Sequence, residues 1–369
     1  MIDWLKVELF CTHSFSISGD HLITLDRHGE VKWDLVRALG LVGSHDARIQ
    51  IKTLARPIRP ICPAGPLHSI TIEGNFVKYF QGHNIFGTGD LHTLIHRMIN
   101  HLVKIPELGL TPTIWDKKTW EDGLIKIKRV DITESWDMGS NIAVDAWLKG
   151  TQVNAQVAYK GRSVYEQGTV YFGKHSKHWS MKFYNKAKEL TAKGHKLHRD
   201  LHEKGLSKKA QGLLRGELVF RHRKLEAMDL NYLRQWKNLP DPKDPLKLDN
   251  PKAIFEDFIS KMKLGTRIRV PDNELDKMPR SLRTAYTLWR NGEDVTAHYK
   301  RTQLYVIKKG LLEIGIDITA PRPKKAEIIP MTRYIEAKRV DAPADWHQEG
   351  LIFDPATSEL PDELKAKER

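Results

Sequence analysis

Apolar and polar residues alternate along several stretches of the first 80 residues, and such alternation is typical of half-buried β-strands. Ile2–Phe10, Ala47–Leu54 and Ser69–Phe80 either alternate or are rich in β-branched residues, and clusters of Gly and Pro separate them. The pattern predicts an antiparallel β region in this part of the chain.

The period of the apolar residues changes after Gly87–Asp90. The following segment, LHTLIHRMINHLVKI, has the apolar spacing of an amphipathic helix, with Thr88 or Asp90 as its N-cap. Gly123–Trp136 returns to a strand pattern, and Asn141–Tyr159 is predicted to be helical.

Two strands joined by a basic turn are predicted next. Gly168–Gly173 and Trp179–Tyr184 have strand patterns on either side of Lys174–His178. Residues 186–210 form a long basic stretch with helical character, and Leu213–Arg223 is again a predicted strand.

Prolines mark the end of this β-rich part. Asn238–Lys252 contains four of them, which favours a linker because proline fits neither a helix interior nor a central strand. Pro279 opens a predicted helix that ends at Asn291. We therefore expect an α+β fold: an antiparallel sheet with flanking helices, followed by a smaller helical domain at 253–320 and an extended, charged tail at 321–369.

The formal charge of +14 favours a polyanionic partner. Nucleic acid is favoured over an anionic membrane surface, since neither end has an amphipathic anchor and no apolar run approaches the ~20 residues that span a bilayer. Cys11 and Cys62 are the only cysteines, so neither a disulfide scaffold nor a cysteine-ligated zinc site is expected. The opening MIDWLKVELF lacks a signal-peptide pattern, and we expect a reducing cytoplasm.

Three of the predicted strands carry ionisable side chains on one face and apolar side chains on the other. If the strands share a sheet, Asp131, Glu217 and Tyr184 could lie around one cleft. The alternative is that these are the solvated faces of a half-exposed sheet. The polar faces carry Arg129, Asp131 and Thr133 on the first strand, Ser180, Lys182 and Tyr184 on the second, and Arg215 and Glu217 on the third.

Four blocks and both ends of the chain resemble one protein family. The blocks are similar, in order and in approximate separation, to the successive signature segments of the gene II/X replication initiators of filamentous phages. The matching segments are QGHNIFGTGDL (81–91), KRVDITES (128–135), GTVYFGKHSKHWSMKFYNKAKEL (168–190), GLLRGELVFRHRKL (212–225), the opening MIDWLKVEL and MPRSLRTAYTLWRNGEDVTAHYKRTQLYVIKKGLLEIGIDIT (278–319).

The resemblance implies a site-specific endonuclease and strand transferase. Such an enzyme nicks the plus-strand origin of the duplex replicative form, leaves a 3′-OH for the host polymerase, and later cuts and circularises the displaced strand. Its implied partners are single-stranded and supercoiled duplex origin DNA, a host helicase and a host DNA polymerase, with no membrane, in the cytoplasm of the bacterial host. Residues 1–120 would be the β-rich N-terminal region, 121–237 the catalytic nicking region, 238–252 the linker, and 253–320 either a DNA-binding domain or a plain helical bundle.

By the family pattern the nucleophile is Tyr184. A phenolate that attacks a phosphodiester forms a 5′-phosphotyrosyl bond and conserves its energy, so that the 3′-OH can later reseal the strand. An ordinary tyrosine has a pKa near ~10, and we expect Lys182 and Lys186 to lower it and to neutralise the charge of the phosphorane. The alternative is an ordinary strand tyrosine whose ring packs on the sheet.

The chain lacks the His-hydrophobic-His pair of better-known rolling-circle initiators, so their two-histidine metal site cannot be transferred to it. A Mg²⁺ or Mn²⁺ ion that polarises the scissile phosphate prefers carboxylate oxygens, sometimes with a histidine. We expect Asp131 and Glu217 as ligands and His83 as a third. The alternatives are salt bridges of the two carboxylates with Arg129 or Arg215, and a turn histidine at 83 that caps the following helix.

Basic and aromatic residues near these strands are the expected DNA contacts. They would hold the phosphate backbone or stack on unpaired bases, as would the basic stretch 186–210. For each aromatic ring, packing in the core is the alternative. The predicted contacts are Arg129, Arg215, Lys174, Lys177 and Trp179.

His195, His198 and His202 are spaced so that they could share one helical face as zinc ligands. Because their stretch is densely charged and has no apolar flank, we expect a solvated basic face that touches DNA instead. Two other functions stay open for the chain: a non-catalytic protein that binds the origin, and a metal nuclease that uses water and forms no covalent adduct.

Overall fold

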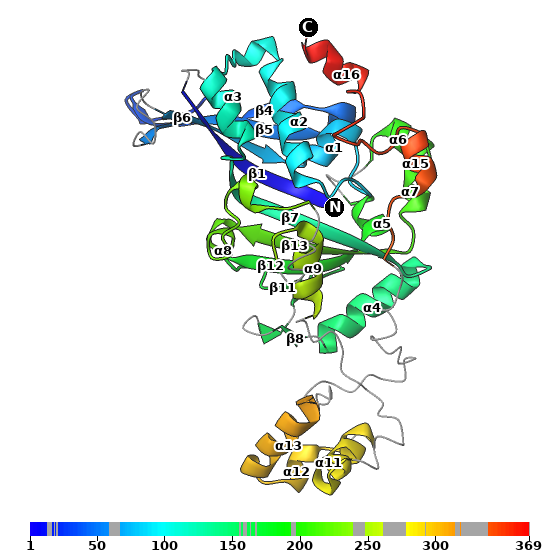
Figure 1. The fold of residues 1–369 in the computed structure, drawn as a ribbon. Coiled ribbons are helices and arrows are strands. Elements are labelled where there is room, and N and C mark those ends of the chain that lie inside the picture. Colours follow the sequence, from blue (N-terminus) through cyan, green and yellow to red (C-terminus); the bar gives the residue numbers. More distant parts are fainter. Residues whose placement is uncertain are drawn as a thin grey trace.

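One nine-stranded antiparallel sheet organises the chain, in the order β10-β11-β12-β13-β7-β1-β6-β5-β4 (Figure 1). The computed structural model describes residues 1–12, 17, 19, 21–58, 67–154, 156–157, 161–162, 164–166, 168–192, 197–238, 248–260, 278–291, 293–313, 318 and 339–368. The strands are β1 (Ile2–Cys11), β4 (Leu39–Val42), β5 (Arg48–Ile58), β6 (Leu67–Gly74), β7 (Lys126–Asp137), β10 (Val164–Glu166), β11 (Thr169–Phe172), β12 (Trp179–Asn185) and β13 (Leu213–Arg221).

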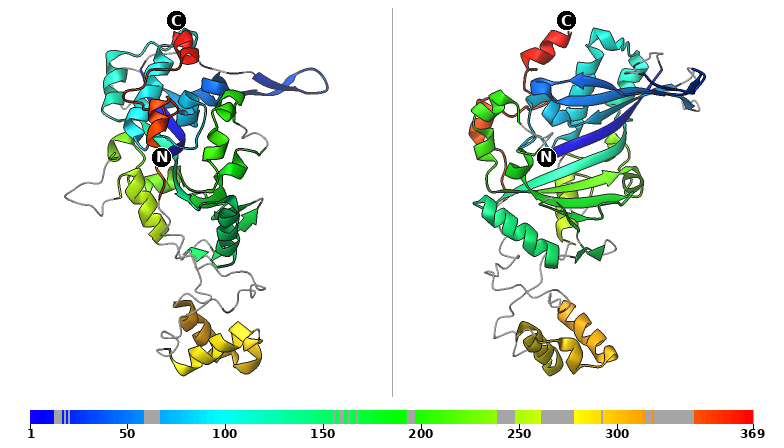
Figure 2. Two further views of the ribbon diagram at one scale, coloured as in Figure 1. Left: turned by 90° about the vertical axis from the view of Figure 1, so that its right-hand side faces the viewer. Right: turned by 180° about the vertical axis from the view of Figure 1, so that it is seen from behind.

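Helices pack on one face of this sheet and form the main hydrophobic core with it. The alternating strand sequences explain this arrangement: Val130 and Ile132 of β7 are fully buried among the helices, while Asp131 and Thr133 lie on the opposite face. The view from behind looks onto this opposite, polar face (Figure 2). The helices of the core are α1 (Phe76–Gln81), α2 (Leu91–Val103), α3 (Ile114–Glu121), α4 (Asn141–Asn154), α8 (His222–Glu226) and α9 (Pro251–Ser260).

The expected α+β class with an antiparallel sheet, flanking helices and a smaller helical part is confirmed. Asp90 caps α2 as predicted, since its carboxylate accepts a hydrogen bond from the Thr93 amide at 2.9 Å. The predicted strand Ser69–Phe80 is only partly correct, because β6 ends at Gly74 and Asn75 caps a helix there. Within the described residues, no helix is both long and apolar enough to cross a bilayer.

The boundary expected at residue 120 does not separate two structural units. β1 lies between β6 and β7, so residues 1–120 and 121–237 build one sheet over one core. The expected helical domain also begins later than residue 253, since Ile254 and Phe255 of α9 are buried in the sheet's core. A separate small core is formed by α11 (Arg280–Asn291), α12 (Val295–His298) and α13 (Arg301–Glu313) (Figure 1).

The expected extended tail is folded over 339–368, a segment that we call the C-terminal strap. It contains α15 (Ala344–Gln348), α16 (Asp362–Lys365) and η4 (Ala366–Glu368). Phe353 stacks on Phe80 with ring centroids 4.5 Å apart, and Trp346 is completely buried. The sequence pattern misses these anchors because the segment is rich in charged residues. A few buried apolar side chains are enough to hold it against the rest of the protein. The preceding part of the predicted tail, 321–338, lies outside the described residues.

A second, smaller core joins the strap to three short helices. Trp346 and Leu351 of the strap pack there with Ile85 and Phe86 of the QGHNIF segment. The long basic helix expected for 186–210 is in fact broken into short pieces, and its residues 193–196 lie outside the described part. The pieces are α5 (Lys186–Glu189), α6 (Arg199–Glu203) and α7 (Leu206–Lys209).

A two-stranded ribbon, β2 (His21–Leu25) and β3 (Val31–Val36), projects from the body (Figure 2). Several of its apolar side chains are exposed, among them Trp33 at 44%. The remaining short elements are β8 (Gln156–Val157), β9 (Gly161–Arg162), η1 (Ser44–Asp46), η2 (Pro106–Leu108) and η3 (Leu233–Gln235).

Candidate active site

The polar face brings Tyr184 and Glu217 into contact. Tyr184 lies on β12 and Glu217 on the neighbouring β13, and the Tyr184 hydroxyl donates a hydrogen bond of 3.3 Å to Glu217 Oε2. Both side chains are buried, at 7% and 3% exposure. The two strands therefore join the expected nucleophile to one of the expected carboxylates.

The phenol of Tyr184 is held in its protonated form. Burial raises its pKa well above the ordinary value, and the nearby charge of Glu217 raises it further. The expectation that Lys182 and Lys186 lower this pKa is wrong for the state described. Lys182 Nζ lies 5.3 Å from the centroid of the Tyr184 ring.

Lys182 is instead the counter-ion of Glu217. Its Nζ lies 2.8 Å from Glu217 Oε1, and it sits directly opposite Glu217 in the register of β12 and β13. Burial acts to lower the pKa of Lys182, but the Glu217 carboxylate outweighs it and raises the pKa above its usual value. One carboxylate oxygen of Glu217 thus pairs with the Lys182 ammonium, and the other accepts the hydrogen bond from the Tyr184 hydroxyl.

Asp131 lies on the same face, one strand further along the sheet. It is paired with Val219 in the register, two residues from Glu217 on β13, and is 1% exposed. Burial raises the pKa of Asp131 to about 7; two hydrogen bonds from Arg129, of 2.8 and 2.7 Å, act against the shift, and the charge of Glu217 adds to it. The salt bridge between Asp131 and Arg129, the alternative to a ligand role, is present.

Lys186 is buried beneath the QGHN segment. Its ammonium donates to Asn84 Oδ1 at 2.8 Å and to Glu189 Oε2 at 2.7 Å, and the residue has no exposed surface. Burial lowers its pKa, and Glu189 opposes the shift. These contacts make Lys186 a residue that positions the segment around Asn84.

Arg215, an expected DNA contact, is buried at 1% exposure. Its guanidinium donates to the carbonyl oxygens of Asn84 and Ile85 and, at 3.1 Å, to the Thr133 hydroxyl. The strand pattern places Arg215 on the correct face, but the loop that covers it comes from a distant part of the sequence. Its observed role is to hold that loop on the sheet.

His83 is the expected third metal ligand, and the structure gives both of its ring nitrogens other partners. Nε2 lies 2.8 Å from the carbonyl oxygen of Leu351, and Nδ1 accepts a hydrogen bond of 3.3 Å from the Ile85 amide. Burial lowers the pKa of His83 to about 4, against the pull of the Leu351 carbonyl. In the part of the chain that the structure describes, His83 does not join Asp131 and Glu217 in a group of metal-binding size.

Asp3 belongs to this site and is missed by the sequence pattern. Its Oδ1 accepts hydrogen bonds from Asn75 at 2.7 Å and from Asn84 at 2.9 Å. Strict alternation would place Asp3 with the core-facing Leu5, but the pairing of β1 with β7 shifts between Ile2 and Trp4. This bulge turns Asp3 toward the polar face, and alternation alone cannot reveal a bulge.

Of the other predicted DNA contacts, Arg129 lies on the same polar face as Glu217 and donates to Asp131. Its guanidinium is 5.6 Å from the Trp4 ring and is partly exposed. Lys174 forms an ion pair with Glu166 and lies over Tyr171, and Lys177 is exposed.

Trp179 differs from the expectation. It lies on the core face, where its ring packs at 4.9 Å from Phe258 of α9. The alternative of core packing is thus correct for this ring.

The arrangement can perform acid–base chemistry on a hydroxyl. A buried phenol hydrogen-bonded to a carboxylate can give up its proton to that carboxylate, and a lysine beside it can neutralise an incoming anion. Two buried carboxylates on neighbouring strands are also the oxygen donors that a hard divalent cation prefers.

Comparisons with known proteins give a consistent result over the length of the chain. A family model described as the N-terminal part of the gene II replication-associated protein matches residues 1–239, and one described as its C-terminal part matches residues 271–352. The gene II replication-associated protein of Enterobacteria phage I2-2 is 27% identical over 357 residues, which are 96% of this chain and 98% of that protein. A solved structure, the rolling circle replication initiator protein from Geobacillus stearothermophilus, covers 87% of this chain and 98% of its own at 12% identity, and its TM-score of 0.31 is too low to bear on the fold.

Proposed function

The chain belongs to the family of gene II replication-associated proteins, and we propose that it is a rolling-circle replication initiator that nicks and rejoins origin DNA with Tyr184 as the nucleophile. The observation that carries the proposal is the hydrogen bond from the Tyr184 hydroxyl to Glu217, on the polar face of the sheet. A buried tyrosine usually has a hydrogen-bond partner for its hydroxyl, but a carboxylate in that place can also accept the proton of the phenol.

In the proposed reaction, Tyr184 Oη attacks the scissile phosphorus and its proton passes to Glu217. The Oη–P bond forms and the bond from phosphorus to the 3′ oxygen breaks; the departing 3′ oxygen takes up a proton from solvent water, so that a free 3′-OH and a 5′-phosphotyrosyl link result. An incoming phosphate competes with Glu217 for Lys182. When Lys182 turns to the phosphate, it releases Glu217 Oε1 and can neutralise charge on the phosphate instead.

Asp131 and Glu217 would hold the divalent cation, Mg²⁺ or Mn²⁺. Both are buried carboxylates, and the pKa of Asp131 is raised to about 7, chiefly by burial with the charge of Glu217 adding to it; the charge of a bound cation would offset both effects. When bound, the ion would polarise the scissile phosphate. Arg129 and Lys182 occupy the two carboxylates in the described state, so metal binding requires that they move.

The test is conversion of a supercoiled plasmid that carries the protein's own origin into open circles, with Mg²⁺ present. We expect wild-type protein to nick and to stay attached to the 5′ end, and the adduct peptide to contain Tyr184. Tyr184→Phe should abolish both, while Tyr171→Phe is the matched control, since Tyr171 faces Lys182 from the neighbouring strand β11.

The other functions predict different results. A protein that only binds the origin would never nick in this assay. A water-using nuclease would nick without a covalent adduct and without resealing. Nicking by Tyr184→Phe at the wild-type rate would leave the enzyme in place and remove Tyr184 as its nucleophile.

A further inference from the structure

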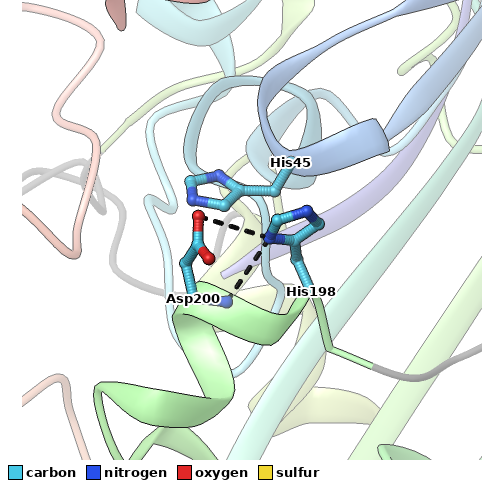
Figure 3. A group of neighbouring side chains, drawn as sticks. All are labelled: His45, His198 and Asp200. Carbon is cyan, nitrogen blue, oxygen red and sulfur yellow. Dashed lines mark hydrogen bonds and ion pairs between the residues drawn. The ribbon is translucent and has the colours of Figure 1, made fainter.

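Away from the candidate active site, His45, His198 and Asp200 converge from two distant parts of the chain (Figure 3). His45 belongs to η1, between β4 and β5, and the other two lie at the start of α6. One potential ligand atom from each residue lies within 4.8 Å of the others. Of the described residues, these three are the group of His, Cys, Asp or Glu side chains that meets this criterion.

We propose that His45, His198 and Asp200 form a binding site for a transition-metal dication of the zinc class. Two imidazoles and one carboxylate are a donor set that Zn²⁺ accepts, with water completing four-coordination. This set differs from the carboxylate pair of the candidate active site, which suits a hard ion such as Mg²⁺. The inference is independent of the nicking activity proposed above.

The donor separations are close to those of such a site. His198 Nδ1 lies 3.6 Å from Asp200 Oδ2. Bonds of ~2.0–2.1 Å in a tetrahedron place donors about 3.4 Å apart, so the separation of this pair is close to the required one. A metal on Nδ1 would replace the hydrogen bond of 3.4 Å that this nitrogen accepts from the Asp200 amide at the start of α6. His45 must approach by about 1.4 Å at most, on the basis of the same bond lengths.

A neighbouring hydroxyl prepares His45 for this role. Ser44 Oγ lies 2.6 Å from His45 Nδ1, which leaves Nε2 as the nitrogen available for a metal. Ligating histidines commonly use a hydrogen bond on the second nitrogen to fix the tautomer and the ring orientation.

The backbone conformation of His45 and two neighbouring residues hold its ring in place. His45 has φ 50° and ψ 47°, in the left-handed region that non-glycine residues seldom adopt. Its amide donates to Glu363 Oε2 at 3.2 Å, and its ring packs against Gly82, where a Cβ would lie 2.6 Å from Nδ1. Only glycine at 82 leaves space for this ring. Both neighbours also link the cluster to the strap and to the QGHN segment.

Helical spacing groups His198 with His195 and His202, a set for which we expect no zinc. His202 is exposed on α6, and His195 lies outside the described residues. The partner of His198 is instead His45, which is more than 150 residues away in the chain. Helical spacing cannot find a ligand on another element.

The site is tested on untagged full-length protein without DNA. Zn²⁺ is titrated against a chromophoric chelator, and Co²⁺ is used to read the coordination from its visible absorption. We expect tight binding of one Zn²⁺ that millimolar Mg²⁺ does not displace. His45→Ala and His198→Ala should each weaken that binding at least 100-fold, while His175→Ala, an exposed histidine outside the cluster, should leave it unchanged.

Two further measurements separate a loss of Zn²⁺ binding from a loss of folding. Far-UV circular dichroism establishes that each variant is folded, and Asp200→Asn, an exposed change on α6, should weaken Zn²⁺ binding without altering the fold. Zn²⁺ should also raise the thermal midpoint of the wild type and not of the variants. If the folded variants bind Zn²⁺ as the wild type does, or if the wild type binds none, the cluster is a hydrogen-bonded group without a metal and the proposal fails. Neither result bears on nicking.

Discussion

The hydroxyl of Tyr184 on β12 donates to Glu217 Oε2 on β13 at 3.3 Å, while Lys182 holds the other oxygen of the same carboxylate at 2.8 Å. The Glu217 carboxylate therefore contacts both the proposed nucleophile, Tyr184, and the ammonium of Lys182 that neutralises the carboxylate. Lys182 lies directly opposite Glu217 in the register of the two strands, and Tyr184 reaches Glu217 diagonally from its position opposite Arg215.

Replacing Glu217 by Gln keeps the shape of the side chain and removes its ability to take a proton. We expect the rate of nicking to fall by about 10²–10⁴, the usual contribution of a general base, while origin binding stays close to wild type. Single-turnover nicking and filter binding measure the two quantities. Glu73→Gln is the control, since Glu73 pairs with Lys6 at 2.5 Å on the polar face, away from Tyr184. Equal losses in both variants would show that the polar face acts only through its charge.

Acid should weaken the fold through His83. The pKa of this buried ring is lowered to about 4, whereas an unfolded histidine titrates near ~6.5. Between these values the unfolded chain binds a proton that the native chain does not, so the free energy of unfolding falls as the pH drops from about 6.5 to about 4, by about 3 kcal/mol in all. Urea unfolding at several pH values measures this slope.

His83→Gln provides the comparison, because an amide can still donate to the Leu351 carbonyl and does not titrate. We expect the variant to lose less stability than the wild type over the same pH range. Parallel curves for the two proteins would mean that other groups cause the acid sensitivity.

Removing the ring of Phe353 should show how firmly the strap is held. Phe353 is 6% exposed, stacks on Phe80 at 4.5 Å and has the Arg97 guanidinium 5.8 Å from its ring centroid. Phe353→Ala is expected to lower the free energy of unfolding by about 3–5 kcal/mol, measured by urea denaturation. Trp115→Ala, at a ring that is 68% exposed on α3, should change it by less than about 0.5 kcal/mol. A loss at Phe353 no larger than that at Trp115 would mean that the strap is detached in solution.

Gly216 separates Arg215 from Glu217 and should not tolerate a methyl group. A Cβ there would lie 2.9 Å from Trp136 Cζ3 and 3.0 Å from Phe183 Cε1, two large rings on the core face. Gly216→Ala should cost about 1–3 kcal/mol of stability through overpacking and should also slow nicking, because β13 must shift. Gly89→Ala has nothing within 4 Å of the new atom and serves as the control. Thermal unfolding and the nicking assay together test this; unchanged values for Gly216→Ala would contradict it.

Local periodicity is sufficient to predict much of this site. Strand alternation places Lys182, Tyr184 and Glu217 on one face, because side chains on a pleated strand change sides at every residue. Alternation cannot predict irregularities within a strand or contacts with residues that are distant in the sequence. The bulge that redirects Asp3 interrupts the period, and the segment that buries Arg215 lies 130 residues away from it.

The same limit explains the errors in domain organisation. The prolines predict a boundary near residue 240, but α9 follows them and packs on the sheet. The strap is rich in charged residues, so its sequence resembles an extended tail. Its buried anchors, Trp346 and Phe353, contact residues that are far away in the sequence. Burial of this kind depends on long-range packing and leaves no local pattern.

The central place of β1 also decides how this protein can be divided. Leu5 pairs with Gly74 on one side and with Val130 on the other, so β1 is the seam between the two halves of the sheet. A fragment that ends near residue 120 would leave one edge of β1 with a row of unpaired amides and carbonyls beside an apolar face, which is a template for aggregation. We therefore expect that fragment to be insoluble when expressed alone, whereas one that runs to residue 260 and is supplied with the strap in trans offers every strand its neighbour.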